Sequence, residues 1–137
     1  MNFDRFGFKA KRVNSKKWLY AGFDNSEELL RWLLRDENNS KYDPAWIDPK
    51  TICQCTGIRD SDGRLIYEND ILEIEALDEN KTGQVYYQEL DCSFRVWLPL
   101  YTTSIQALMS LAEMTSKKVR VIGNKFDKEV ENDKNLH

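Results

Sequence analysis

Four carboxylate side chains lie close together in the middle of the chain, at Asp60, Asp62, Glu68 and Asp70. Carboxylates grouped at turns are the oxygen ligands that magnesium and calcium prefer, and a bound divalent ion can support phosphodiester hydrolysis. The spacing is not that of an EF-hand, because Gly63 comes fourth instead of sixth in the loop and the glutamate at the twelfth position is missing. Aspartates also form turns by accepting backbone N–H groups, and we favour this structural role. A carboxylate-dependent nuclease built on Asp60, Asp62 and Asp70 is a distant alternative.

Other catalytic sets are missing from the sequence. The only histidine is the last residue, His137, whereas Ser-His-Asp and Cys-His catalysis and His-ligated zinc need an internal histidine in a fixed position. The six glycines form neither a G-x-x-x-x-G-K-[ST] nor a G-x-G-x-x-G phosphate loop. We therefore predict a protein that is not an enzyme, with no catalytic residues.

Three cysteines, Cys53, Cys55 and Cys92, give an odd number. Tetrahedral thiolate zinc needs about four ligands, and no histidine is available to complete the set. Strand alternation would place Cys53 and Cys55 on one face, as small core residues. We predict free thiols, no metal and no cofactor.

The net charge of −3 is unevenly distributed. Residues 1–20 carry six Lys or Arg residues and one acid, Asp4, which gives this end +5 and the other 117 residues −8. A candidate nucleic-acid surface consists of Lys9, Lys11, Arg12, Lys16 and Lys17, near the aromatic residues Phe8, Trp18 and Tyr20. Alternation is expected to place the aromatics on the face opposite the lysines, in the core, and a solvated strand face explains the basic end equally well.

Elements that would position these residues follow from periodicity. Alternation predicts a strand at residues 6–11, and a turn at 14–17 leads to a partner strand at 18–23, which makes an N-terminal hairpin. Asn25 with Glu28 is a capping-box pattern and predicts a helix. Thr103–Gln106 is a second such pattern, and it predicts a short helix that buries Ile105, Leu108, Met109 and Ala112.

The central segment reads as β structure. Residues 53–58 and 65–67 form a predicted hairpin around the tight turn 60–63, in which Gly63 takes a positive φ. A second turn at 68–70 leads into the strand that starts at Ile71. Runs at 83–87, 93–98 and 118–126 supply the remaining strands, and residues 127–137 read as a tail.

Residues 52–72 resemble the signature of the YopX family of phage and prophage proteins, Q-Y-T-G-[LI]-x-D-x-x-G-x-x-I-Y-E-G-D-I-[VL]. The matches are Gln54, Thr56, Gly57, Ile58, Asp60, Gly63, Ile66, Tyr67, Glu68, Asp70, Ile71 and Leu72. Gly123 and Asn124 also match a closing V-I-G-N motif. Asn69 stands where the family has glycine, and asparagine tolerates the same left-handed conformation. The resemblance implies a phage accessory protein and a fold, and it assigns no biochemical activity.

Together these observations predict a mainly β protein, α+β by content: a small SH3-like barrel with an N-terminal β-hairpin and two short helices. We expect one domain over residues 1–137, with the hairpin and first helix in 1–50, the barrel in 51–126 and the tail in 127–137. No apolar run is long enough to cross a membrane, and we expect the host cytoplasm. The expected role is a non-enzymatic module that binds a phage or host protein, with self-association as one form of it. Nucleic-acid binding by the basic hairpin is the alternative. Gly57, Gly63, Asn69 and Gly123 are the predicted fold-critical positions.

Overall fold

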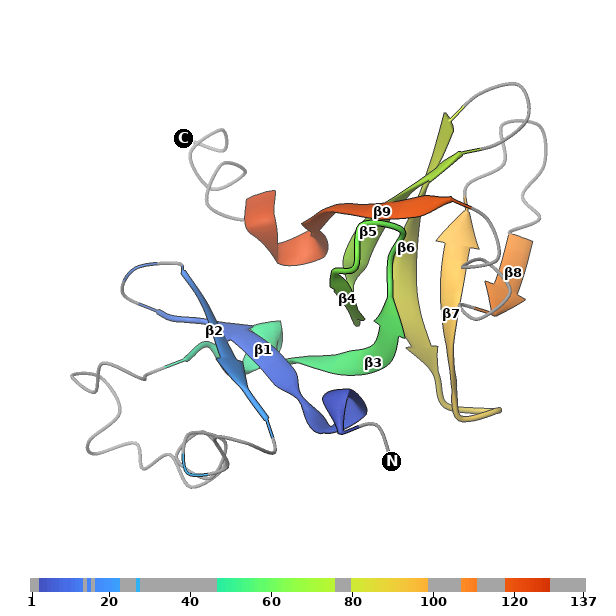
Figure 1. Cartoon of the computed structure of the whole chain (residues 1–137). Coiled ribbons are helices and arrows are strands. Elements are labelled where there is room, and N and C mark those ends of the chain that lie inside the picture. The colour runs from blue at the N-terminus through green and yellow to red at the C-terminus, as the bar shows by residue number, and fades with distance from the viewer. Residues whose placement is uncertain are drawn as a thin grey trace. The chain divides into compact units, whose positions relative to one another are not determined.

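The computed structural model describes residues 3–13, 15, 17–22, 27, 47–75, 80–98, 107–110 and 118–128. These residues are mainly β, in two antiparallel sheets, which confirms the predicted class (Figure 1). Three short 3-10 turns are the defined helical elements among them: η1 (Asp4–Phe6), η4 (Pro49–Thr51) and η5 (Lys125–Lys128). Of the helix predicted from Asn25 onward, only Glu27 lies within the described residues, and it is helical.

The chain divides into two compact units, residues 1–57 and 58–137. The boundary falls inside strand β3 (Cys53–Arg59). The expectation of a single domain stays a prediction.

The first unit contains the N-terminal hairpin, as predicted. Strand β1 (Phe8–Lys11) pairs antiparallel with β2 (Trp18–Ala21), and its other edge pairs with β3 through Phe8–Gln54 and Lys9–Cys53. Ala10, Ala21 and Ile47 form the buried core of this unit, and Phe8, Leu19 and Ile52 pack against it. The apolar side of the hairpin, which carries Phe8, Ala10, Leu19 and Ala21, therefore contributes to this core.

The second unit holds a five-stranded sheet in the order β8-β7-β6-β5-β9. Its strands are β5 (Asp70–Glu75), β6 (Asn80–Gln88), β7 (Ser93–Leu98), β8 (Ala107–Ser110) and β9 (Val119–Asn124). Strand β4 (Leu65–Tyr67) instead lies beside β3, in a four-stranded sheet of order β2-β1-β3-β4.

One core cluster forms the interior of this unit. It consists of Ile66, Leu72, Ile74, Val85, Val96 and Val119, each of which is at most 3% exposed. Ile58, Phe94 and Val121 pack against this cluster. Since residues two apart on a strand share a face, the cluster fixes which side of the five-stranded sheet is inside.

The prediction of a helix led by Thr103 is wrong where the structure describes it. Residues 107–110 are strand β8, and Leu108 and Met109 pair with Trp97 and Val96 of β7. The helical spacing of apolar residues was a weak local preference, and hydrogen bonding to the free edge of β7 outweighs it. Ile105 and Ala112 lie outside the described residues.

The two sheets are open in the part of the chain that the structure describes, so SH3-like closure is not confirmed. Among the described residues, no helix combines the length and apolar character that a membrane crossing requires.

Candidate functional site

The carboxylate of Asp60 organises the first signature turn. One oxygen, Oδ1, accepts the backbone N–H groups of Asp62 at 2.9 Å and Arg64 at 2.8 Å. Gly63 has a φ of +87°, and the Arg59 side chain donates to its carbonyl at 2.7 Å, which closes the turn. Asp60 is only 7% exposed. The predicted tight turn is therefore confirmed, with Asp60 as its acceptor.

The same turn also covers the edge of β9. The second oxygen of Asp60, Oδ2, accepts the Val121 N–H at 2.9 Å. Ser61 donates its backbone N–H to the Val119 carbonyl and accepts the Val119 N–H on its hydroxyl, both at 2.9 Å. These groups of β9 point away from β5 and would otherwise form an open sheet edge.

Asp70 and Asn124 form a second buried polar pair. The Asn124 side-chain amide donates to Asp70 Oδ1 at 2.8 Å, and Asp70 Oδ2 accepts the Tyr67 N–H at 2.8 Å. Asp70 is fully buried, and Asn124 is 3% exposed. Asn124 Oδ1 also accepts the Phe126 N–H at 3.0 Å, so this side chain connects β5 to η5.

Asn69 adopts the left-handed conformation, with a φ of +69°, as predicted from its place in the signature. Its N–H donates to the Val85 carbonyl at 2.8 Å, and its own carbonyl accepts the Lys125 N–H at 2.9 Å. The backbone at this residue therefore bridges β6 and η5. A residue that resisted positive φ would break both bonds.

The remaining signature residues lie around these turns. Ile66 is fully buried and Tyr67 is 9% exposed, whereas Thr56, Glu68 and Ile71 are half-buried. Gly57 has a φ of +78°, whereas Gly123 does not have a positive φ, so glycine's special conformation is needed at the first of the two.

The acidic cluster is not assembled as a metal site among the described residues. Both carboxylates that the turns bury, Asp60 and Asp70, accept hydrogen bonds on both oxygens. No group of three or more His, Cys, Asp or Glu side chains in the described parts of the chain could hold a metal ion. The arrangement of these acids is that of turn formers.

The basic residues of the hairpin are placed differently from the sequence expectation. Lys9 and Lys11 are 7% and 8% exposed, and their Nζ atoms lie 4.6 and 5.4 Å from the centre of the Trp18 ring. The expectation that the aromatics lie in the core, facing away from the lysines, is wrong for Trp18 and Tyr20. They pair directly with Lys11 and Lys9, directly paired residues share a face, and Tyr20 is exposed. Arg12 is half-buried, Lys17 is exposed, and Lys16 lies outside the described residues.

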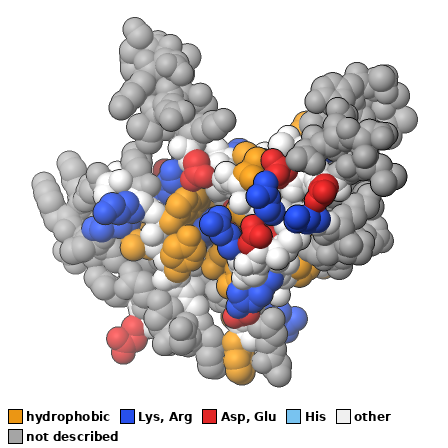
Figure 2. Space-filling model, turned by 45° about the horizontal axis from the view of Figure 1, so that its top comes forward, with side chains coloured by type: hydrophobic (Ala, Val, Ile, Leu, Met, Phe, Trp, Pro, Cys, Tyr) orange, Lys and Arg blue, Asp and Glu red, His pale blue; other side chains and the backbone are white. Residues whose placement is uncertain are grey.

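Figure 2 shows acidic and basic side chains interleaved over one face of the protein, with hydrophobic side chains among them. This view does not present a continuous basic surface. Lys9 and Lys11 of β1 are almost fully buried, so they are a poor match to a broad phosphate-binding stripe.

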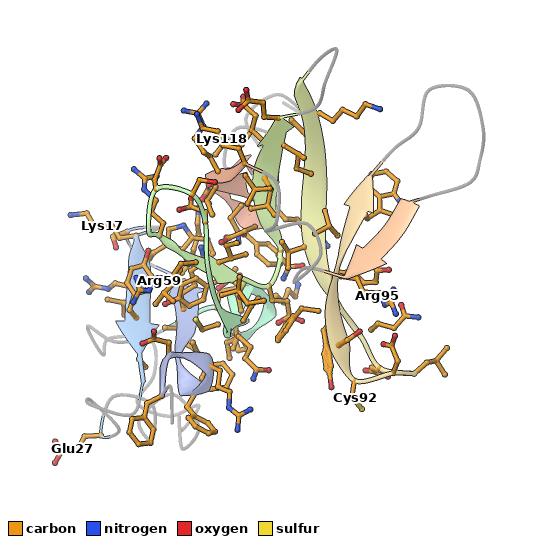
Figure 3. All side chains as sticks on the ribbon, turned by 45° about the vertical axis from the view of Figure 1, so that its right-hand side comes forward. Lys17, Glu27, Arg59, Cys92, Arg95 and Lys118 are labelled. Carbon is orange, nitrogen blue, oxygen red and sulfur yellow. The ribbon has the colours of Figure 1, made fainter. Side chains whose placement is uncertain are left out.

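The cysteines separate into two kinds. Cys53 and Cys55 are fully buried on β3, and Cys92 is exposed at the turn between β6 and β7, with a φ of +53° (Figure 3). All three are free thiols. A hydrogen bond with Cys92 is the main cause that raises the pKa of the Tyr87 hydroxyl, ahead of partial desolvation.

One surface was not singled out in the sequence. Val85 and Val96 pair with each other in the core, so the alternate residues on β6 and β7 face the opposite side of the sheet. We call this side the outer face, and its central residues are Ile71, Gln84, Tyr86, Arg95 and Trp97. The signal available in the sequence was the alternation at 84–86 and 95–97, which becomes informative once the strand register is known.

The outer face has an aromatic centre and charged surroundings. Gln84 pairs with Trp97 on one side and with Ile71 on the other, and Tyr86 pairs with Arg95 in the next row. Trp97 is 38% exposed, and the other four residues are half-buried.

Two ion pairs involve residues of the same sheet: Arg95 of β7 with Asp91 of the preceding turn, and Arg120 of β9 with Glu73 of β5. Arg95 and Ser93 lower the pKa of the Asp91 carboxylate by hydrogen bonding to it. The Glu73 carboxylate raises the pKa of Arg120 in the same way.

No curated protein matches the chain. The family model described as YopX protein matches residues 6–129, which include both buried polar turns and the outer face. The chain belongs to the YopX family.

Proposed function

We propose that this protein is a non-enzymatic phage accessory module that binds another protein through its outer face. The observation that carries this proposal is the 38% exposure of Trp97, on a regular strand beside Tyr86 and Arg95. Trp, Tyr and Arg are the residue types most enriched among the energetically dominant residues of protein interfaces. Because strand pairing already fixes the backbone that carries these side chains, binding would require little further ordering of the backbone.

The placement of the acidic residues supports a role without catalysis. Asp60 and Asp70 are occupied by backbone N–H groups and by Asn124, and both are buried. A carboxylate that already accepts bonds on both oxygens is poorly suited to move protons or hold a metal during a reaction. The sequence offers no internal histidine as a substitute.

The ion pairs near the aromatic centre suit an interface rim. The Arg95–Asp91 and Arg120–Glu73 pairs are internally neutralised, so they can border a buried aromatic contact without introducing a lone charge. We expect the partner to be a phage or host protein met in the host cytoplasm. We also propose that the strands close as an SH3-like barrel in this family member.

The test compares Trp97→Ser with Leu90→Ser. Leu90 is 94% exposed at the turn between β6 and β7, so its variant removes a solvent-exposed apolar side chain of the same unit without touching the outer face. The wild-type protein would be used to capture a partner from phage-infected cells, and the complex would then be rebuilt from purified components. Light scattering of the protein alone would report self-association.

We expect Trp97→Ser to weaken the purified complex at least about tenfold, as is common for a central tryptophan, and Leu90→Ser to leave it unchanged. Both variants should keep the wild-type melting temperature. A folded Trp97→Ser protein that binds the partner as tightly as wild type would contradict the proposal. So would a strictly monomeric wild-type protein that captures nothing.

A further inference from the structure

The turn η1 exposes two aromatic rings and a guanidinium group side by side. Phe3 is 49% exposed and Phe6 is 39% exposed, with 6.4 Å between their ring centres. The guanidinium carbon of Arg5 lies 4.9 Å from the centre of the Phe6 ring. We call residues 3–6 the aromatic–arginine turn. Single exposed apolar residues are common on protein surfaces, whereas apolar side chains exposed side by side more often mark an interaction site.

Contacts within the first unit hold this turn in place. The Phe6 N–H donates to the Phe3 carbonyl at 3.0 Å, and the Gln54 side-chain amide donates to the Arg5 carbonyl at 3.5 Å. Directly after the turn, the Gly7 carbonyl accepts the Cys55 N–H at 2.8 Å. The turn is therefore attached to β3.

Gly57 provides the space for this attachment. A Cβ atom added to Gly57 would lie 3.0 Å from the Arg5 Cβ, closer than real Cβ contacts normally come. The signature glycine thus lets the base of Arg5 approach β3. The backbone that carries the exposed rings and the guanidinium is therefore held against β3.

We propose that the aromatic–arginine turn is a stacking site for the bases of single-stranded nucleic acid. Every base has a flat π face, and proteins that bind single strands without sequence preference use exposed aromatic rings and arginine planes for it. The turn offers both, from Phe3, Phe6 and Arg5. Residues 3–6 also include the half-buried Asp4, so the turn has one cation and one acid. Because the contact would be made by ring faces and one guanidinium plane, it would read little or no base sequence.

Charge and stacking together favour nucleic acid as the kind of chain that meets this turn, since an acidic protein surface would match the charge but supply no flat bases to stack on the rings. Residues 1–20 carry +5, whereas the rest of the chain carries −8, so a phosphate backbone is attracted to this end and repelled elsewhere. Lys17, directly before β2, is exposed and available for phosphate contact. This site differs from one centred on Lys9 and Lys11, whose ammonium groups lie against Trp18. It is also separate from the outer face, because it belongs to the other unit.

The experiment measures fluorescence anisotropy of a labelled oligothymidylate of about twenty nucleotides, long enough for one site, at about 50 and about 200 mM salt. The full chain is compared with the double variant Phe3→Ala/Phe6→Ala and with Arg5→Lys. The Arg5→Lys variant keeps the charge and removes the planar group. Trp97→Ser serves as the matched control, since it removes an exposed aromatic ring from the other unit.

We expect wild-type binding that weakens at least about fivefold between the two salt concentrations. The double phenylalanine variant should bind at least about tenfold more weakly, Arg5→Lys several-fold more weakly, and Trp97→Ser as wild type, all with unchanged melting temperatures. No binding at 50 mM salt would overturn the proposal. Equal oligonucleotide binding by the folded double variant would also overturn it. The proposal would be overturned as well if the double variant lost self-association of the protein and no oligonucleotide bound. The Trp97→Ser variant separates this site from the proposed protein interface.

Discussion

The carboxylate of Asp60 and the backbone N–H of Val121 are joined by a 2.9 Å hydrogen bond across a sequence separation of 61 residues. The other oxygen of the same carboxylate closes its own turn at Asp62 and Arg64. One side chain therefore fixes a local turn and attaches it to a distant strand.

Replacing Asp60 with Asn should be destabilising. An amide has one acceptor oxygen where the carboxylate has two, so at least one partly buried N–H group would lose its partner, at a cost of about 1–3 kcal/mol. Asp62→Asn makes the same change of charge at an exposed position and should stay within about 0.5 kcal/mol of wild type. Urea unfolding measures both, and equal midpoints would contradict the role assigned to Asp60.

The Asp70–Asn124 pair can be tested by a double-mutant cycle. Asn124→Asp would place a second carboxylate against buried Asp70, and we expect a loss of about 3 kcal/mol or more. The exchange Asp70→Asn/Asn124→Asp restores one amide and one carboxylate, so it should recover at least about 1 kcal/mol of that loss. Recovery should be partial, because the bond from Asn124 to the Glu68 carbonyl is not rebuilt. Additive losses in the cycle would show that the two side chains do not interact.

Asn69 should tolerate glycine and reject a β-branched residue. Asn69→Val forces a β-branched side chain into a φ of +69°, and we expect a cost of about 1–2 kcal/mol. Asn69→Gly fits the conformation without strain and should differ from wild type by about 0.5 kcal/mol or less. The denaturation midpoints of the two variants, compared with wild type, measure these costs. An unchanged midpoint for the valine variant would mean that the conformation at this position carries no strain.

Two signature glycines with positive φ should respond differently to alanine. Gly63 has open space around it, so Gly63→Ala adds only the cost of a left-handed alanine, about 1–2 kcal/mol. Gly57→Ala adds the same backbone cost and also pushes against Arg5, so it should be the more destabilising change. A comparison of their melting temperatures measures the difference. Equal shifts would indicate that the Arg5 turn moves away without cost.

The depressed pKa of Asp91 predicts a small effect of acid. A carboxylate with a lower pKa in the folded state contributes stability at pH values above its unfolded pKa of about 3.9, and that contribution disappears as the pH falls through the folded value. Asp91 is exposed, so salt should weaken the effect.

An NMR titration measures the contribution of Arg95 to this shift. The pKa of Asp91 should rise toward its ordinary value in Arg95→Gln, because the largest cause of the shift is removed. Lys118→Gln is the matched control, since it removes an exposed cation that pairs with Glu75 instead, and it should leave the Asp91 pKa as in wild type. An Asp91 pKa that stays equally low in Arg95→Gln would contradict the role assigned to the arginine.

The parts of the fold that could be predicted are those that depend on residue types at nearby positions in the sequence. The turn at 60–63 and the left-handed Asn69 follow from Asp, Gly and Asn at fixed offsets, and the N-terminal hairpin follows from alternation. The reach of Asp60 to Val121 could not be predicted, because it depends on which distant strand lies beside the turn. Strand β8 was missed for a related reason: its apolar residues fit a helix locally, and the free edge of β7 decided their conformation.

The candidate surfaces were harder to predict than the turns. The direct pairing of Lys11 with Trp18 places both on one face, and a different turn length would have separated them. The exposure of Phe3 and Phe6 could not be predicted either, because a sequence pattern does not distinguish an exposed apolar residue from a core residue. Register and exposure come from tertiary structure, and both candidate surfaces depend on them.

The turn that covers β9 affects how readily this protein aggregates. Asp60 and Ser61 occupy the outward N–H groups of Val119 and Val121 and the Val119 carbonyl, so these groups of the sheet border are not available to pair with a foreign strand. Proteolytic cleavage near Gly63, or loss of the Asp60 carboxylate, would release those groups. The first visible symptom of a weakened signature turn should therefore be chain-to-chain aggregation that starts before the core unfolds.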